Sequence, residues 1–150
     1  MTDSQPSDGP AYTQEVWLKH LEFIQAIIAR LANNSFLMKG WAITISGALY
    51  GFAASHLSWP IAAVGLVPTA SFWYLDSYFL MNERLYRRLY NDVALNGSRV
   101  PPLSLDPSAY RKESALWPVL FSHTLAIFYG VLAAAGIILV LATLAHQMTD

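Results

Sequence analysis

Asp76 is the acidic residue with the most unusual surroundings, because 36 residues without a formal charge separate it from Lys39. If this stretch folds as a helical hairpin about residues 57 and 58, antiparallel helices place Lys39 and Asp76 at the same depth. The pair then forms a salt bridge that locks the hairpin, or Asp76 serves as an ion-binding or gating acid, as ionisable groups within membranes often do. The nearby lysine favours the salt bridge.

The four histidines are candidates for proton or metal chemistry. His123 stands beside Ser122 and Thr124 near the start of a second uncharged stretch, where it could line a pore, respond to pH, or bond a neighbouring helix. The other histidines, at positions 20, 56 and 146, are far apart and lack the three- or four-residue spacing of helical metal ligands. We therefore predict neither a metal site nor a cofactor.

Arg84, Arg87 and Arg88 form a basic face that we expect to lie in the cytoplasm, with Glu83 one helical turn before Arg87. Attraction to anionic lipid explains such a face most simply, and a nucleotide or phosphoprotein ligand is the alternative. The chain has no phosphate-binding glycine loop, nucleophile elbow or paired carboxylates, which predicts a protein that is not an enzyme. A net charge of -1 argues against binding to nucleic acid.

The elements that position these residues are membrane-spanning helices. Hydrophobic residues make up 55% of the chain and charged residues only 13%, and a second uncharged stretch of 36 residues lies between Glu113 and Asp150. A membrane helix needs about 20 mostly apolar residues. The first stretch is long enough for two spans around a turn near Pro60, and the second for one. We predict an all-α integral membrane protein with three transmembrane helices, a tight hairpin plus a C-terminal span.

All nine basic residues lie before the first span or between the second and third. Under the positive-inside rule, both segments face the cytoplasm, and the hairpin tip and C-terminus face outward. This predicts a multi-pass membrane protein with its N-terminus in the cytoplasm and its C-terminus outside. The predicted parts are a disordered N-terminus (1–12), an amphipathic cytoplasmic helix (13–35), the hairpin with a cytoplasmic extension of its second helix (40–96), a cytoplasmic connector (98–115) and the third span (116–146).

Two rows of small residues predict helix contact faces, because close backbone approach drives helix association in lipid. The first span carries Gly40, Thr44, Gly47 and Gly51, and the third carries Ser122, Ala126, Gly130 and Ala134. One row could serve packing within the chain and the other a homo-oligomer. The row on the first span is the better candidate for the oligomer contact, because Gly47 and Gly51 lie one turn apart near mid-membrane.

Two segments, 38–44 and 72–90, resemble parts of small uncharacterised prokaryotic membrane proteins. The layout of residues 12–96 is similar to two-span effector modules of nucleotide-signalling and antiphage defence systems, although a third span departs from that pattern. The resemblance implies an effector that oligomerises and permeabilises the inner membrane.

Two functions are therefore expected from the sequence. The first is a non-enzymatic homo-oligomeric effector or small channel, whose pore would be lined by Thr44, Ser46, Ser71 or Ser122. The alternative is a membrane anchor or accessory subunit that recruits a cytoplasmic protein partner. An anchor of this kind should keep an exposed apolar patch on its cytoplasmic helices.

Overall fold

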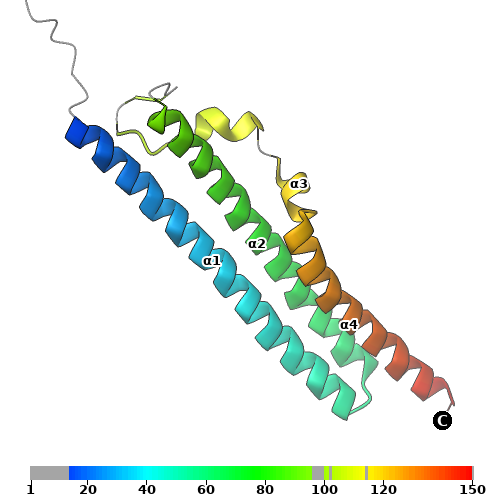
Figure 1. Ribbon diagram of the computed structural model, residues 1–150. Helices are drawn as coiled ribbons and strands as arrows, with labels where there is room; N and C mark the ends of the chain where they lie inside the picture. The colour runs from blue at the N-terminus through cyan, green and yellow to red at the C-terminus, as the bar shows by residue number, and fades with distance from the viewer. Residues whose placement is uncertain (1–13, 96–99, 102, 114, 150) are drawn as a thin grey trace, which may run out of the picture.

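The computed structural model describes residues 14–95, 100–101, 103–113 and 115–149, and the described part is built from helices. The elements are α1 (Gln14–Ser55), α2 (Trp59–Ala94), the 3₁₀ helix η1 (Ser108–Glu113), α3 (Leu116–Leu120) and α4 (His123–Thr149). The prediction of an all-α fold is confirmed for these residues. Two long antiparallel helices, α1 and α2, lie side by side, and α4 runs along the lower half of α2 (Figure 1). The predicted disorder of residues 1–12 lies outside the described residues.

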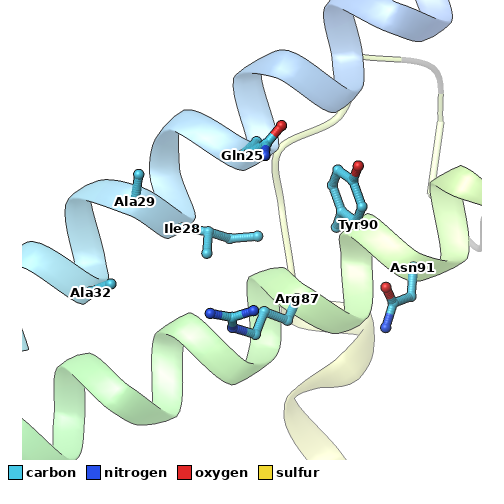
Figure 2. Close-up of a pocket in the computed structure, with 7 residues that line it drawn as sticks. All are labelled: Gln25, Ile28, Ala29, Ala32, Arg87, Tyr90 and Asn91. Carbon is cyan, nitrogen blue, oxygen red and sulfur yellow. The ribbon is translucent and has the colours of Figure 1, made fainter.

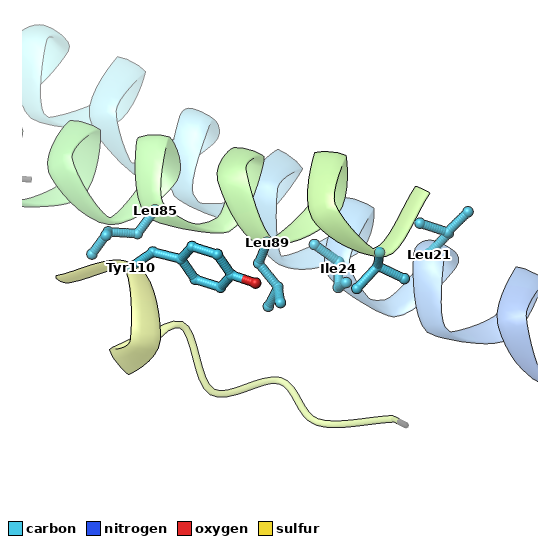
Figure 3. Packing of buried hydrophobic residues seen from close by; sticks show 6 residues of the cluster. Leu21, Ile24, Leu85, Leu89 and Tyr110 are labelled. Carbon is cyan, nitrogen blue, oxygen red and sulfur yellow. The ribbon is translucent and has the colours of Figure 1, made fainter. Parts of the chain in front are cut away.

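Helix α1 is continuous over 42 residues, whereas the sequence analysis separates an amphipathic helix at 13–35 from a span that begins at Gly40. The prediction of two elements is wrong because no proline interrupts this stretch, and a single glycine is tolerated within a helix. The N-terminal half of α1 packs on the C-terminal extension of α2. Leu21 and Ile24 of α1 are buried in one cluster with Leu85 and Leu89 of α2, and Tyr110 of η1 lies beside Leu85 and Leu89 (Figure 3).

The turn between α1 and α2 is tight. The Ser58 backbone N–H donates to the Ala53 carbonyl at 3.0 Å, and Leu57 adopts a φ of 47°. This is the hydrogen-bond pattern of a Schellman motif, in which glycine usually occupies the left-handed position that Leu57 takes here. Pro60 lies in the first turn of α2, where its missing N–H costs nothing. The predicted hairpin is therefore present.

The connector after α2 leads back toward the bundle through η1 and α3. Asp106 accepts hydrogen bonds from the backbone N–H and the hydroxyl of Ser108, which hold the pKa of its carboxyl below the ordinary value. The last uncharged stretch forms two helices, because the chain turns at Phe121 and Ser122 between α3 and α4. Beyond this turn, α4 runs unbroken through Gly130 and Gly136, as one helix rather than a hairpin.

Within the described residues, one helix, α4, is long and apolar enough to cross a membrane by length and composition. By this measure the structure supports one span where the sequence analysis predicts three. The uncharged halves of α1 and α2 fall short because glycine, serine, threonine and aromatic residues make up much of them.

Candidate functional site: a buried carboxylate where three helices meet

Asp76 is fully buried and receives hydrogen bonds from α1 and α4. The Lys39 ammonium lies 2.7 Å from Asp76 Oδ2, and the Tyr129 hydroxyl donates to the same oxygen at 3.1 Å. The Ser35 hydroxyl donates to Asp76 Oδ1 and accepts a hydrogen bond from Lys39 Nζ at 3.0 Å. A buried carboxylate is tolerated only when it is paired and hydrogen-bonded, and Asp76 has three donors.

The ion pair between Lys39 and Asp76 is present at the depth that the hairpin spacing predicts. Sequence reasoning missed its two hydroxyl partners. Ser35 lies one helical turn before Lys39, so the helical period contains a signal for it. Tyr129 stands alone among apolar residues of α4, and no spacing rule connects it to a residue 53 positions earlier. We call Ser35, Lys39, Asp76 and Tyr129 the Asp76 cluster.

Aromatic side chains seal the Asp76 cluster on the side of α3 and α4. The Trp73 ring stacks on the Tyr129 ring with centroids 6.0 Å apart and planes 6° from parallel. Its indole N–H donates to the Leu120 carbonyl at 2.9 Å, next to the turn between α3 and α4. Trp73 therefore ties the tyrosine of the cluster to the break between α3 and α4. With Asp76 sealed and saturated by donors, the geometry corresponds to a structural ion pair more closely than to an open ion-binding or gating site.

A second polar layer lies deeper in the bundle. Thr69 shares hydrogen bonds with Ser46 at 2.8 Å and with the Tyr50 hydroxyl at 3.1 Å, and Ser46, Thr69 and Tyr50 are all buried. The Tyr50 ring fits between two glycines of neighbouring helices. A Cβ added to Gly65 would lie 2.5 Å from Tyr50 Cε1, and one added to Gly136 would collide with the Tyr50 hydroxyl.

The first small-residue row points away from these contacts. Gly40, Thr44, Gly47 and Gly51 are exposed, and a Cβ added to any of the three glycines would meet nothing within 4 Å. They lie on the side of α1 opposite Ala42, Ser46 and Ala53, which are buried. We call Gly40, Thr44, Gly47 and Gly51 the glycine face. Packing within the chain instead uses Gly65 and Gly136, which the sequence analysis did not single out.

The second row, on α4, is only partly covered. Ser122, Ala126 and Gly130 are half-buried, and Ala134 is exposed. A Cβ added to Gly130 would also meet nothing within 4 Å. The buried side of α4 is formed instead by Leu125, Tyr129, Gly136 and Thr143. The row therefore lies at the edge of the contact with the bundle.

The basic face on α2 borders an open groove between α1 and α2. Arg84, Arg87 and Arg88 are exposed, and Arg87 forms the predicted pair with Glu83 one turn earlier at 2.8 Å. Figure 2 shows the groove, of about 440 Å³, where Arg87 and Tyr90 of α2 lie across from small residues of α1. The residues lining it are Gln25, Ile28, Ala29, Ala32, Arg87, Tyr90 and Asn91.

The histidines are not brought together. His123 is exposed at the first position of α4, and His20 is buried in the N-terminal half of α1, where its Nε2 lies 2.9 Å from the Ser104 carbonyl. Across the described part of the chain, no group of three histidine or acidic side chains is placed to hold a metal ion. Comparison with known proteins finds no matching family, no curated relative and no similar solved structure.

Proposed function

We propose that this protein is a non-enzymatic, three-span protein of the bacterial inner membrane that works as a homo-oligomer, as a membrane-permeabilising effector or small channel. Its N-terminus and the basic face lie in the cytoplasm, and its C-terminus lies outside.

The placement in a membrane is supported by the distribution of side chains beyond Lys39 and Asp76. In this half of the bundle the hydroxyl groups of Ser46, Thr69 and Thr143 face inward. Large apolar side chains face outward over all three helices. They include Ile43, Phe52, Val64, Val67, Ile127, Val131, Ile138 and Leu141. Water would penalise this arrangement, whereas lipid accepts exposed apolar groups and penalises unpaired polar ones.

The observation that carries the oligomer is the glycine face. Gly65 and Gly136, the glycines that pack within the chain, lie against the Tyr50 side chain. The glycines at positions 40, 47 and 51 leave a flat surface open. Flat surfaces of small residues allow the closest approach between membrane helices. A second copy that packs here would gain contacts that the single chain does not make.

A conducting pore requires several copies, because most polar groups inside the single chain are already hydrogen-bonded within it. Ser46, one of the residues expected to line a pore, instead bonds Thr69 inside the bundle, and the Ser122 hydroxyl is covered. Thr44 and Ser71 remain exposed, although each hydroxyl bonds a carbonyl of its own helix. Thr44 belongs to the glycine face, so an oligomer assembled there would bring copies of this hydroxyl together.

The test combines oligomer mass with ion flux. Gly47→Leu with Gly51→Leu should lower the mass of the detergent-solubilised protein and abolish flux in proteoliposomes while insertion is retained, since both changes raise apolarity. The matched control, Val67→Leu with Ala70→Leu, enlarges exposed residues of α2 and should leave mass and flux unchanged. A wild-type protein that is monomeric in mild detergent would refute the oligomer.

A membrane anchor is the second candidate, and one observation favours it. Leu18 and Phe23 are about half exposed on the cytoplasmic half of α1. A groove of about 470 Å³ is lined by Phe23 together with Ala26, Ile27, Arg30 and Leu105. Such a patch suits an apolar helix of a partner protein. An anchor conducts no ions. A wild-type protein that forms the oligomer but shows no ion flux under any condition would therefore favour this function.

A further inference from the structure

The amino end of α4 is a separate feature that begins six residues before Tyr129 of the Asp76 cluster. Helix α4 begins at His123 after the turn at Phe121 and Ser122, and His123 and Thr124 are exposed there. The first N–H groups of a helix have no partner within it, and they carry partial positive charge. The Ser122 hydroxyl, just before the helix, is covered and has no hydrogen-bond partner among the described residues. This end of α4 is therefore suited to an anionic group.

An apolar groove starts one turn further along α4. It has a volume of about 390 Å³ and lies between α1 and α4, where the two helices separate because α4 packs mainly on α2 (Figure 1). Its lining is apolar throughout and consists of Ile43, Ile127, Phe128, Val131, Leu132 and Ala135. The groove has no polar group that a peptide backbone or a water molecule could bond.

The dimensions match one acyl chain of a lipid. The twelve residues from His123 to Ala135 rise about 18 Å along the helix at 1.5 Å per residue. Half of the hydrocarbon core of a bilayer measures about 15 Å. The amino end of α4 and the groove together thus cover about the depth of one membrane leaflet.

Lys39 supplies positive charge at the mouth of the groove. It lies one helical turn before Ile43, and its side chain is 24% exposed. Its ammonium binds Asp76 and Ser35, which leaves one of its three donors unused. Asp76 is the acid at this level among the described side chains, and it is fully buried, so an anion that approaches from outside meets the lysine.

We propose that the amino end of α4 and the groove below it bind one phospholipid of the cytoplasmic leaflet. The phosphate lies against the first-turn N–H groups of α4 and the Lys39 ammonium, and one acyl chain fills the groove. This inference rests on the membrane placement proposed above. It adds a specific lipid as a component of the protein and does not require an oligomer.

The headgroup contact is tested by native mass spectrometry of the delipidated protein with added phosphatidylglycerol or with diacylglycerol of the same chains. The wild type should bind phosphatidylglycerol more tightly. Thr124→Asp should weaken this binding about tenfold by repelling the phosphate. The helix itself should not suffer, because a carboxylate in the first turn is favourable. Thr124→Asn, of nearly equal size and without charge, should bind as the wild type does.

The acyl contact is tested by a pair of tryptophan substitutions. Val131→Trp fills the groove and should remove most phosphatidylglycerol binding. Ile138→Trp changes an equally exposed residue of α4 outside the groove and should not. Equal loss in both variants, or equal binding of diacylglycerol and phosphatidylglycerol to the wild type, would overturn the proposal. Inorganic phosphate that binds as tightly as the lipid would show a free-anion site instead and would also overturn it.

Two further results separate this proposal from the others. If Val131→Trp lowers the oligomer mass and leaves lipid binding intact, a second copy fills the groove and the lipid site is refuted. Membrane insertion, measured by resistance to alkaline extraction, should be retained in every variant. A wild type that resists alkaline extraction but binds phosphatidylglycerol no more tightly than diacylglycerol refutes the lipid site alone. A wild type that is extracted by alkali refutes the membrane placement itself.

Discussion

Removal of Lys39 should destabilise the protein more than neutralisation of Asp76, although each change breaks the same ion pair. Lys39→Met leaves the Asp76 carboxylate fully buried with only two hydroxyl donors. An uncompensated charge of this kind costs about 3–5 kcal/mol. Asp76→Asn leaves an amide that still bonds the hydroxyls of Ser35 and Tyr129. The lysine that remains is 24% exposed and reaches water or headgroups through its long side chain.

The loss from Asp76→Asn is therefore the smaller one, about 1–2 kcal/mol for weakened hydrogen bonds. The double variant carries no charge at the site and should lose about as much as Asp76→Asn alone. The coupling free energy between the two positions then equals the loss from Lys39→Met, about 3–5 kcal/mol, far above the roughly 0–1 kcal/mol of an exposed pair. Complete burial of Asp76 is the structural reason for the difference.

The assay is reversible unfolding in mixed micelles of mild detergent and dodecyl sulfate, followed by far-ultraviolet circular dichroism. The four proteins of the cycle are the wild type, the two single variants and the double variant. Losses that add in the double variant would show that the charges do not interact. A Lys39→Met protein as stable as the wild type would show that Asp76 is hydrated in the folded state, against the sealed geometry of the Asp76 cluster.

Three further predictions concern single positions. Gly136→Ala should cost about 1–3 kcal/mol by overpacking against the Tyr50 hydroxyl, whereas Gly130→Ala, which meets open space, should leave the free energy of unfolding unchanged or slightly raised. Leu57→Gly should raise it by about 1 kcal/mol, because the left-handed φ of 47° strains a residue with a Cβ. The lowered pKa of Asp106 adds stability that is present above its unfolded pKa and is lost as pH falls through the folded pKa. Titration of this carboxyl by nuclear magnetic resonance should place its midpoint below that of the unfolded chain.

The hairpin and its ion pair follow from the sequence because both depend on local rules. Charge-free length, one turn signal at Pro60 and the rise per residue of a helix are enough to bring Lys39 opposite Asp76. The break predicted before Gly40 is wrong, because a change from an amphipathic to an apolar pattern alters what surrounds a helix and not whether it continues. A break requires a residue that disrupts the backbone, and residues 36–39 contain neither proline nor glycine.

The position of α4 could not be predicted in the same way. Its contacts with the hairpin depend on Tyr129, which reaches Asp76, and on Gly136, which accommodates Tyr50. Each is a single residue whose partner lies in another helix, and periodicity carries no information about such pairs. The small-residue rows were a poor guide for a related reason. Spacing reveals that residues share a face, but only the packed structure reveals which face the bundle leaves open.

Beyond Lys39 and Asp76, buried hydroxyls and outward-facing apolar side chains explain why average hydropathy ranks the helices unevenly. Helix α4 is the most apolar helix and is largely exposed, whereas α1 and α2 carry the hydroxyls that bond each other at Ser46 and Thr69. In a membrane, interhelical hydrogen bonds and close packing of small residues hold helices together, since apolar side chains gain little by leaving lipid. A low average hydropathy in α1 and α2 is then what a packed pair of spans requires. Replacing Ser46 and Thr69 together by alanine and valine would raise the hydropathy of both helices, and it should weaken their association in the membrane.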